Sequence, residues 1–264
     1  MARIITIMTD FGIRDGFVAV MKGVILGIAP DVRLIDVTHL ISPQSVREGA
    51  VVFGRGAGYY SAGTVHICVV DPGVGTARRP MAARLGTQIY IGPDNGLITF
   101  MHARAKREGW PMEFYQLDQP KYWLPEISNI FHGRDIFAPV AAHLASGVPL
   151  DSVGSRIDDP VLLPLSPVER TANGVRGEVI HIDHFGNLAT SIREADLAGL
   201  GSLGVRVRGT EIKGLVRTFG DRAPGELVAL INSVGELSVA VVNGNAAQRL
   251  GAQVGDPIEV FRPS

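Results

Sequence analysis

The chain has little cysteine and almost no net charge, and each shortage excludes a class of protein. Cys68 is its only cysteine, so there is no internal disulfide framework and no cysteine-rich metal site. A net charge of -1 gives no general attraction for nucleic acid or an anionic membrane. No apolar run is long enough to cross a bilayer, and the start lacks the pattern of a signal peptide. We therefore expect a cytoplasmic protein.

Hydrophobic residues make up 46% of the chain, which is enough for a sizeable core. In the first part, β-branched runs alternate with segments of helical spacing, and this alternation predicts an α/β domain with a mostly parallel sheet. The predicted strands are 4–9, 32–37 and 64–70, followed by a hairpin around Gly86. The predicted helices are 16–29, with Asp15 as N-cap, then 46–59, 96–108 and 135–146.

The pattern changes after residue 150, where 158–174 are rich in proline and polar residues and lack a helical period. We predict an N-terminal α/β domain at 1–160, a linker at 161–174 and a second domain at 175–264. Short β-type runs between glycine, asparagine and aspartate turns fill the last segment. They predict a smaller antiparallel β-barrel or sandwich.

Acidic residues follow two of the predicted parallel strands, Asp10 after the first and Asp71 after the third. Ligands of open parallel sheets bind beyond the carboxyl ends of the strands, so this placement favours a ligand site. A carboxylate can hold a vicinal diol with both oxygens, so Asp10 suits a ribose. Either residue alone can equally be an ordinary turn cap.

The stretch VVDPGVGTARRP (69–80) contains GVG but lacks the GK[ST] ending of a phosphate loop, so we reject a nucleotide triphosphatase. Its glycines permit positive φ and a close approach, which allows Arg78 or Arg79 to return toward Asp71. A purely structural Asp–Arg pair is the alternative. His132 begins a predicted helix and has a side chain suited to proton transfer near neutral pH, although a lone histidine often only packs. The histidines show no zinc-ligand spacing.

In the second domain, HIDHFGN (181–187) and residues 232–251 are the notable stretches. The ring of Phe185 offers a face for stacking on a base, and the amide of Asn187 offers donors and acceptors. The alternative is a plain hairpin with FGN at its tip, and HIDH looks like strand.

Seven motifs occur in order along both domains: TDFGIRDGFVAVMKG, DVTHLISPQSVREGA, VVDPGVGTARRP, GPDNGL, FHGRDIFAPVAAHLA, IDHFGN and NSVGELSVAVVNGNAA. Together they resemble the S-adenosyl-L-methionine (SAM) hydroxide adenosyltransferases, which are SAM hydrolases related to fluorinating and chlorinating enzymes. The resemblance implies that SAM and water give adenosine and L-methionine, with no metal and no cofactor. It also implies a homotrimer that holds SAM between the N-terminal domain of one subunit and the C-terminal domain of the next.

The resemblance also implies roles for single residues. The water-handling set falls on Asp71, Arg78 and His132, and whether Asp71 or His132 takes the proton stays open. The implied substrate-binding residues are Asp10 for the ribose, Asp183 for the methionine ammonium, Phe185 and Asn187, and Ser233, Asn245 and Ala246 near the methionine and adenine ends. Gln44 departs from the pattern, because relatives often carry an aromatic ring there beside the ribose.

Two other functions are alternatives. A SAM-dependent halogenase is disfavoured, because the halogenating relatives lack the water-handling set and carry an extra loop. A SAM or adenosine binding module without turnover is disfavoured because a binder does not need Asp71, Arg78 and His132.

Overall fold

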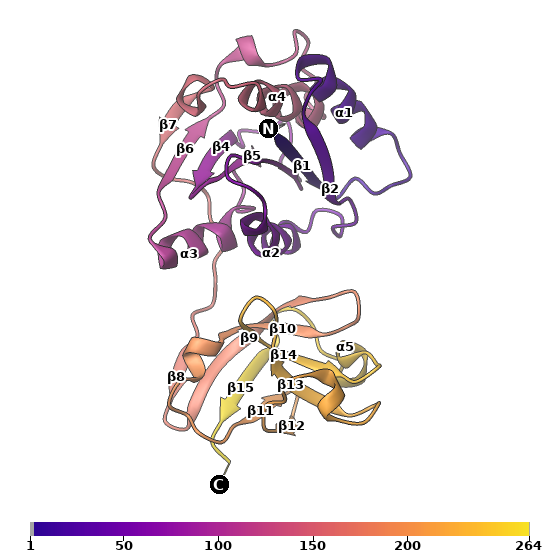
Figure 1. The fold of residues 1–264 in the computed structure, drawn as a ribbon, viewed down its shortest axis with the longest axis vertical. Coiled ribbons are helices and arrows are strands. Elements are labelled where there is room, and N and C mark those ends of the chain that lie inside the picture. The colour runs from indigo at the N-terminus through magenta and orange to yellow at the C-terminus, as the bar shows by residue number, and fades with distance from the viewer. Residues whose placement is uncertain (1–2, 264) are drawn as a thin grey trace. The chain divides into compact units, whose positions relative to one another are not determined.

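The computed structural model describes residues 3–263 and forms two compact units, Met1–Leu163 and Pro164–Ser264 (Figure 1). The division falls inside 161–174, the stretch that we predicted as a linker. Part of this stretch is regular structure, because β8 (Glu169–Thr171) pairs with the following strand of the second unit. The α/β class of the first unit and the antiparallel β class of the second are confirmed.

The first unit is built on a seven-stranded sheet with the order β2-β1-β3-β5-β4-β6-β7. Its strands are β1 (Ile4–Thr9), β2 (Arg33–Thr38), β3 (Val65–Val69), β4 (Pro80–Leu85), β5 (Gln88–Pro93), β6 (Met112–Gln116) and β7 (Ser155–Ile157). The pairs β2–β1, β1–β3 and β3–β5 are parallel, whereas β5–β4, β4–β6 and β6–β7 are antiparallel. The sheet is thus mixed, with its parallel part on the side where the acidic strand ends lie.

Helices cover both faces of this sheet. They are α1 (Phe17–Ile28), α2 (Val46–Gly56), α3 (Thr99–Glu108) and α4 (Ala138–Ala145), and short helical turns lie at η1 (Ala57–Tyr59), η2 (Pro120–Tyr122) and η4 (Leu150–Ser152). The residues before α4 form a π-helix, η3 (Gly133–Phe137). The predicted cap of α1 is wrong, because Gly16 occupies the N-cap position and no side chain caps the helix. Asp15 lies one residue before the N-cap position, so it does not cap the helix.

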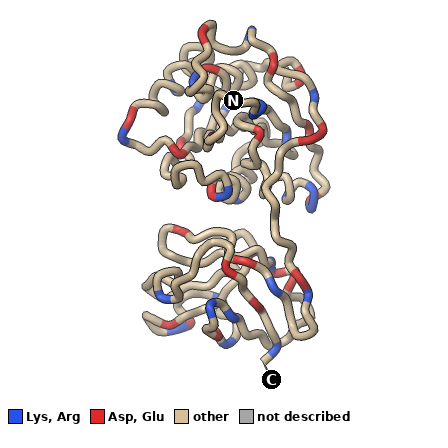
Figure 2. Tube along the Cα trace, turned by 180° about the vertical axis from the view of Figure 1, so that it is seen from behind, with Lys and Arg blue, Asp and Glu red and all other residues tan. Residues whose placement is uncertain are grey.

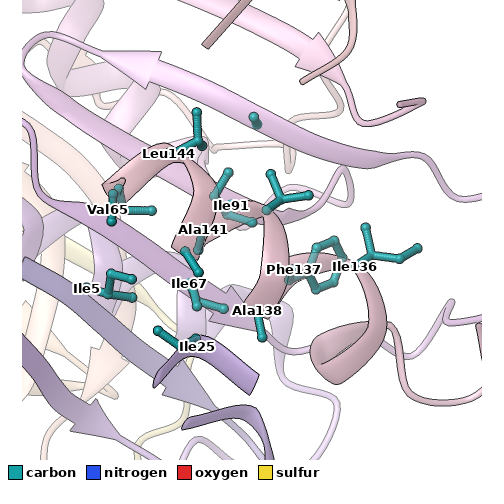
Figure 3. Packing of buried hydrophobic residues seen from close by; sticks show 14 of the residues in the cluster. Ile5, Ile25, Val65, Ile67, Ile91, Ile136, Phe137, Ala138, Ala141 and Leu144 are labelled. Carbon is teal, nitrogen blue, oxygen red and sulfur yellow. The ribbon is translucent and has the colours of Figure 1, made fainter. Parts of the chain in front are cut away.

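The strand residues alternate between two cores, as the β period requires. Ile5, Ile7 and Ile67 pack with α1 and α4, and Figure 3 shows this side with Ala138, Ala141 and Leu144 of α4 near the strands. Met8 and Cys68 point to the opposite core, under α2 and α3. Burial raises the pKa of the Cys68 thiol, which makes it an inert packing residue.

The second unit is an eight-stranded antiparallel sheet with the order β12-β11-β15-β9-β10-β14-β13, and β8 beside β9. The strands are β9 (Gly174–Ile182), β10 (Leu188–Arg193), β11 (Gly204–Val207), β12 (Thr210–Lys213), β13 (Leu227–Ile231), β14 (Glu236–Val241) and β15 (Pro257–Phe261), with the helix α5 (Ala246–Leu250) and the turns η5 (Glu194–Leu197) and η6 (Phe219–Asp221). Contacts between β12 and β13 make the sheet nearly closed, and its core is apolar.

Acidic and basic residues are interspersed along the Cα trace of each unit (Figure 2). Among the helices of residues 3–263, none is long and apolar enough to cross a membrane.

Candidate functional site

Two of the predicted acids lie at the carboxyl ends of adjacent parallel strands. Thr9 of β1 is in register with Val69 of β3, and the Asp10 backbone N–H donates to the Val69 carbonyl at 3.3 Å. Asp10 and Asp71 therefore leave the same edge of the sheet. This is the edge at which open parallel sheets bind ligands.

Asp10 is held by the backbone of Gln44. The Gln44 N–H donates to Asp10 Oδ2 at 2.8 Å. Gln44 has φ 66°, a left-handed conformation that is uncommon for a residue other than glycine. Because the bond comes from the main chain, the departure from an aromatic side chain at this position leaves the support of Asp10 intact.

Asp71, Arg78 and His132 form one hydrogen-bonded group. Arg78 returns across the turn as a fork, with Nε donating to Asp71 Oδ1 at 3.0 Å and Nη2 donating to Asp71 Oδ2. The same Nη2 lies 3.2 Å from His132 Nδ1. The side chains of Arg78 and Asp71 are only 7% and 5% exposed, so the ion pair is shielded from water. Of the two arginines that we considered, the structure thus selects Arg78.

Arg78 fixes which nitrogen of His132 carries the proton. A guanidinium only donates, so Nδ1 accepts, and a neutral His132 carries its hydrogen on Nε2. Burial and the neighbouring Arg78 lower the pKa of His132, which keeps the ring neutral near pH 7. Burial raises the pKa of the Asp71 carboxyl, against the opposing effect of Arg78.

Arg78 has donor capacity beyond these bonds. Within residues 3–263, its Nη1 is buried and has no hydrogen-bond acceptor. The guanidinium also lies over the ring of Phe137, with Arg78 Cζ 5.6 Å from the ring centroid. The group is therefore fixed on two sides and retains one buried donor.

The segment before His132 packs on the turn that carries Asp71. A Cβ on Gly75, at φ 75°, would lie 2.2 Å from the Asn129 carbonyl oxygen, so only glycine fits there. Phe131 makes an edge contact with Phe11, the residue after Asp10, at 5.9 Å between centroids. His132 itself directly precedes the π-helix, a type of turn that occurs often at functional sites.

In the second unit, Asp183 organises the hairpin between β9 and β10. Its Oδ1 accepts from the backbone N–H groups of Phe185 and Asn187, both at 2.9 Å, and its Oδ2 accepts from Asn187 Nδ2 at 2.8 Å. Phe185 is 71% exposed at the tip. His184 lies in this turn and not on the strand, which corrects the predicted strand for HIDH.

A second predicted loop packs on this hairpin. Asn245 caps α5, accepting from the Gln248 N–H at 2.7 Å, and lies so close to Gly186 that a Cβ there would clash. The side chain of Ala246 is buried in the core, so only its backbone can face a ligand. Ser233 lies in the exposed turn between β13 and β14, and it makes none of the contacts that join these two loops.

Arg79 was the other candidate partner for Asp71, and the stretch Pro93–Asn95 received no predicted role. Arg79 turns away from Asp71 and binds Asp94 with Nη2 at 2.7 Å. The motif GPDNGL, one of the seven, contains Asp94 and Asn95 and was the sequence signal that could have pointed to them. Within residues 3–263, no group of three or more His, Cys, Asp or Glu side chains is arranged to hold a metal ion.

Comparison with known proteins gives consistent matches along both units. The family model of the SAM hydroxide adenosyltransferase N-terminal domain matches residues 5–154, and that of the C-terminal domain matches 177–259. An (R)-S-adenosyl-L-methionine hydrolase of Salinispora tropica is 44% identical, with 97% of each chain covered. A fluorinase of an Actinoplanes species is 35% identical, with 90% of each chain covered.

A similar fold is known from a solved structure. An uncharacterized conserved protein from Thermotoga maritima superimposes with a TM-score of 0.90 at 36% identity, and the match covers 98% of this chain and 100% of that chain.

Proposed function

This chain belongs to the SAM hydroxide adenosyltransferase family and is an S-adenosyl-L-methionine hydrolase, and we propose that Asp71, Arg78 and His132 prepare the attacking water. The observation that carries the assignment of these residues is their buried hydrogen-bonded group at the carboxyl edge of the parallel strands.

The reaction is a displacement at the ribose C5′ carbon. The water oxygen forms a bond to C5′ while the C5′–S bond breaks, its electron pair goes to sulfur, and L-methionine leaves as a neutral thioether. The water loses one proton, and adenosine is the other product. Because a sulfonium is already an activated leaving group, we propose that no metal or cofactor is required. The remaining difficulty is the weakness of water as a nucleophile.

We assign the proton to Asp71. Its two oxygens accept one Arg78 hydrogen bond each and the backbone of Gly73 adds a third, so the carboxylate retains acceptor capacity for the water. Burial raises its pKa, which makes it a stronger base than an exposed aspartate. His132 is less suited, because its Nδ1 lone pair already faces the Arg78 guanidinium.

His132 and Arg78 then act as donors. The Nε2–H of neutral His132 is free of the Arg78 contact and can donate to the water oxygen as negative charge develops on it. The guanidinium, with its buried Nη1, favours the same hydroxide-like oxygen by its charge. Both groups are fixed before substrate binds, so little reorganisation is needed.

The other candidate residues are proposed to hold SAM. Asp10 accepts one bond from Gln44, which leaves a free oxygen for the ribose diol. Asp183 accepts three hydrogen bonds inside its hairpin, and its Oδ2 retains capacity for the methionine ammonium. We propose that Phe185, Asn187, Ser233, Asn245 and Ala246 complete the SAM contacts. We also propose a homotrimer whose sites lie between the first unit of one subunit and the second unit of the next.

The deciding experiment follows the products from purified protein and SAM by chromatography, with and without halide. Adenosine and methionine are expected in equal amounts. A 5′-halogenated adenosine would support the halogenase instead, and tight SAM binding without products would support a binding module. Loss of turnover in Asp71→Asn with SAM affinity retained would tie the hydrolysis to the buried group.

A further inference from the structure

We propose that Asp94 and Asn95 are positioning residues for the Asp71–Arg78 ion pair, an inference that rests on the proposed function of that pair. Both follow β5, the strand that lies between β3 and β4 in the sheet. The turn that carries Asp71 and Arg78 connects β3 to β4. The two residues, here called the Asp94–Asn95 corner, thus lie beside both ends of that turn.

Asn95 holds the Asp71 end. Its side-chain Nδ2 donates to the Val70 carbonyl at 2.9 Å, and Val70 directly precedes Asp71. The same amide uses its Oδ1 to accept from the Leu97 N–H at 3.4 Å. The amide therefore connects the start of the following helical segment to the backbone from which Asp71 projects.

Asp94 holds the Arg78 end through the next residue, Arg79. The Asp94 side chain is fully buried, and its Oδ2 accepts from Arg79 Nε at 2.9 Å and lies 2.7 Å from Nη2 in an ion pair. The Asp94 N–H also donates to the Arg79 carbonyl at 2.9 Å. Arg79 is therefore bound by Asp94 through both its side chain and its backbone, immediately beside Arg78.

The outer side of Arg79 is held as well. Its Nη1 donates to Asp159 Oδ1 at 2.8 Å and its Nη2 donates to the Asp159 carbonyl at 2.7 Å. Asp94 Oδ1 accepts from the Val161 N–H at 2.7 Å. Asp94 thus has a hydrogen-bonding partner for each oxygen, as a fixed buried carboxylate needs.

Within the turn, the fork of Arg78 on Asp71 is joined by local bonds such as Val74 N–H to the Asp71 carbonyl and Thr76 N–H to the Gly73 carbonyl, both at 3.2 Å, and these bonds do not tie the turn to the neighbouring strand β5. The two ends of the turn are therefore placed by the corner. A displacement of about 1 Å at a reacting group can lower the rate by about a hundredfold. The corner acts on the reaction through the fork geometry of the ion pair and touches no reacting atom.

The test uses Asn95→Ala, which removes the bond to Val70, and Arg79→Lys and Arg79→Gln, which keep or remove the charge facing Asp94. Arg84→Gln is the control, because Arg84 lies on β4 away from the turn and forms a partly exposed ion pair with Glu113 of β6. We expect Asn95→Ala and Arg79→Gln to lower kcat by about tenfold or more with little change in KM for SAM. Arg79→Lys should retain a higher kcat than Arg79→Gln. Arg84→Gln should match the wild type.

A second readout does not depend on turnover. Arg78 lowers the pKa of His132, so a loosened Arg78 should raise the pKa of the His132 ring, measured by NMR titration of the free protein. If the wild type proves inactive on SAM, the proposed function fails but this shift still tests the corner. A folded Asn95→Ala with wild-type kcat and an unchanged His132 titration would overturn the proposal. Should that variant not fold, Asn95→Asp takes its place and is judged by the same measurements. This substitution removes the donor to the Val70 carbonyl and keeps an acceptor for the Leu97 N–H.

Discussion

Replacing His132 by glutamine and by alanine separates the donor role of this residue from a base role. A glutamine amide can accept from Arg78 with its oxygen and donate with its nitrogen, but it cannot take a proton near neutral pH. An alanine side chain can neither accept from Arg78 nor donate to the water, and it cannot take a proton. If His132 donates to the developing hydroxide, His132→Gln should retain kcat within about tenfold of the wild type, because one neutral donor replaces another.

The expected loss in His132→Ala follows from the bonds that the ring makes. Truncation removes the proposed bond to the charged oxygen and leaves Arg78 Nη2 with one acceptor fewer. A hydrogen bond to a charged group is worth about 1.5 to 3 kcal/mol, which corresponds to a rate loss between about tenfold and about 150-fold. SAM affinity should change little, because the ring is not proposed to contact the substrate. Single-turnover rates and calorimetric affinities measure the two quantities separately.

The pH dependence gives a further distinction. If Asp71 takes the proton, kcat falls as the pH drops through the raised pKa of Asp71, and this acid limb persists in His132→Gln. If His132 were the base, the limb would disappear and the glutamine and alanine variants would lose equal activity. Equal losses would therefore refute the assignment. In Asp71→Asn, a further change at His132 should add little, since both residues handle one water.

Three further predictions follow from the same structure. Gly75→Ala should lower kcat, because its Cβ would push the Asn129 carbonyl and the segment leading to His132; Tm and kcat measured together separate this from unfolding. Burial lowers the pKa of His66 to about 4 from 6.5, so the unfolded chain binds the extra proton first and the free energy of unfolding falls by about 3 kcal/mol as the pH drops from about 7 to about 4. Urea unfolding at a series of pH values should show that the free energy of unfolding depends less on pH in His66→Gln than in the wild type. Mixing an Asp10→Ala chain with an Asp183→Ala chain should restore activity if sites are shared between subunits, and activity that only equals the sum of the two separate variants would argue against shared sites.

The elements were largely predictable because their patterns are local. The β-branched run at 4–9 coincides with β1, and the hairpin predicted around Gly86 is formed by β4 and β5. The placement of Asp10 and Asp71 at one edge was also predictable, since parallel strands bring their carboxyl ends together.

Features that depend on distant contacts were not predictable. Arg78 and Arg79 have the same chemistry, so the residue types alone left both open; the family resemblance pointed to Arg78, and the path of the turn brings it to Asp71. The corner acts through a carbonyl of Val70, and a backbone acceptor leaves no mark in a sequence. The packing of Asn245 against Gly186 joins residues far apart in the chain, so propensities at either position do not reveal it.

The π-helix at Gly133–Phe137 has a consequence for how the sequence can change in length. A π turn holds about one residue more than an α turn, and each residue of a helix turns its axis by about 100°. Deleting one residue there would let an unbroken α-helix form while α4 stays packed on the sheet, and His132 would be rotated away from Arg78 by about that angle. The buried residues of the π-helix, Ile136 and Phe137, would shift in the core, and the proton-handling group would be dismantled. Lineages that shorten this turn by one residue should therefore lose the hydrolysis.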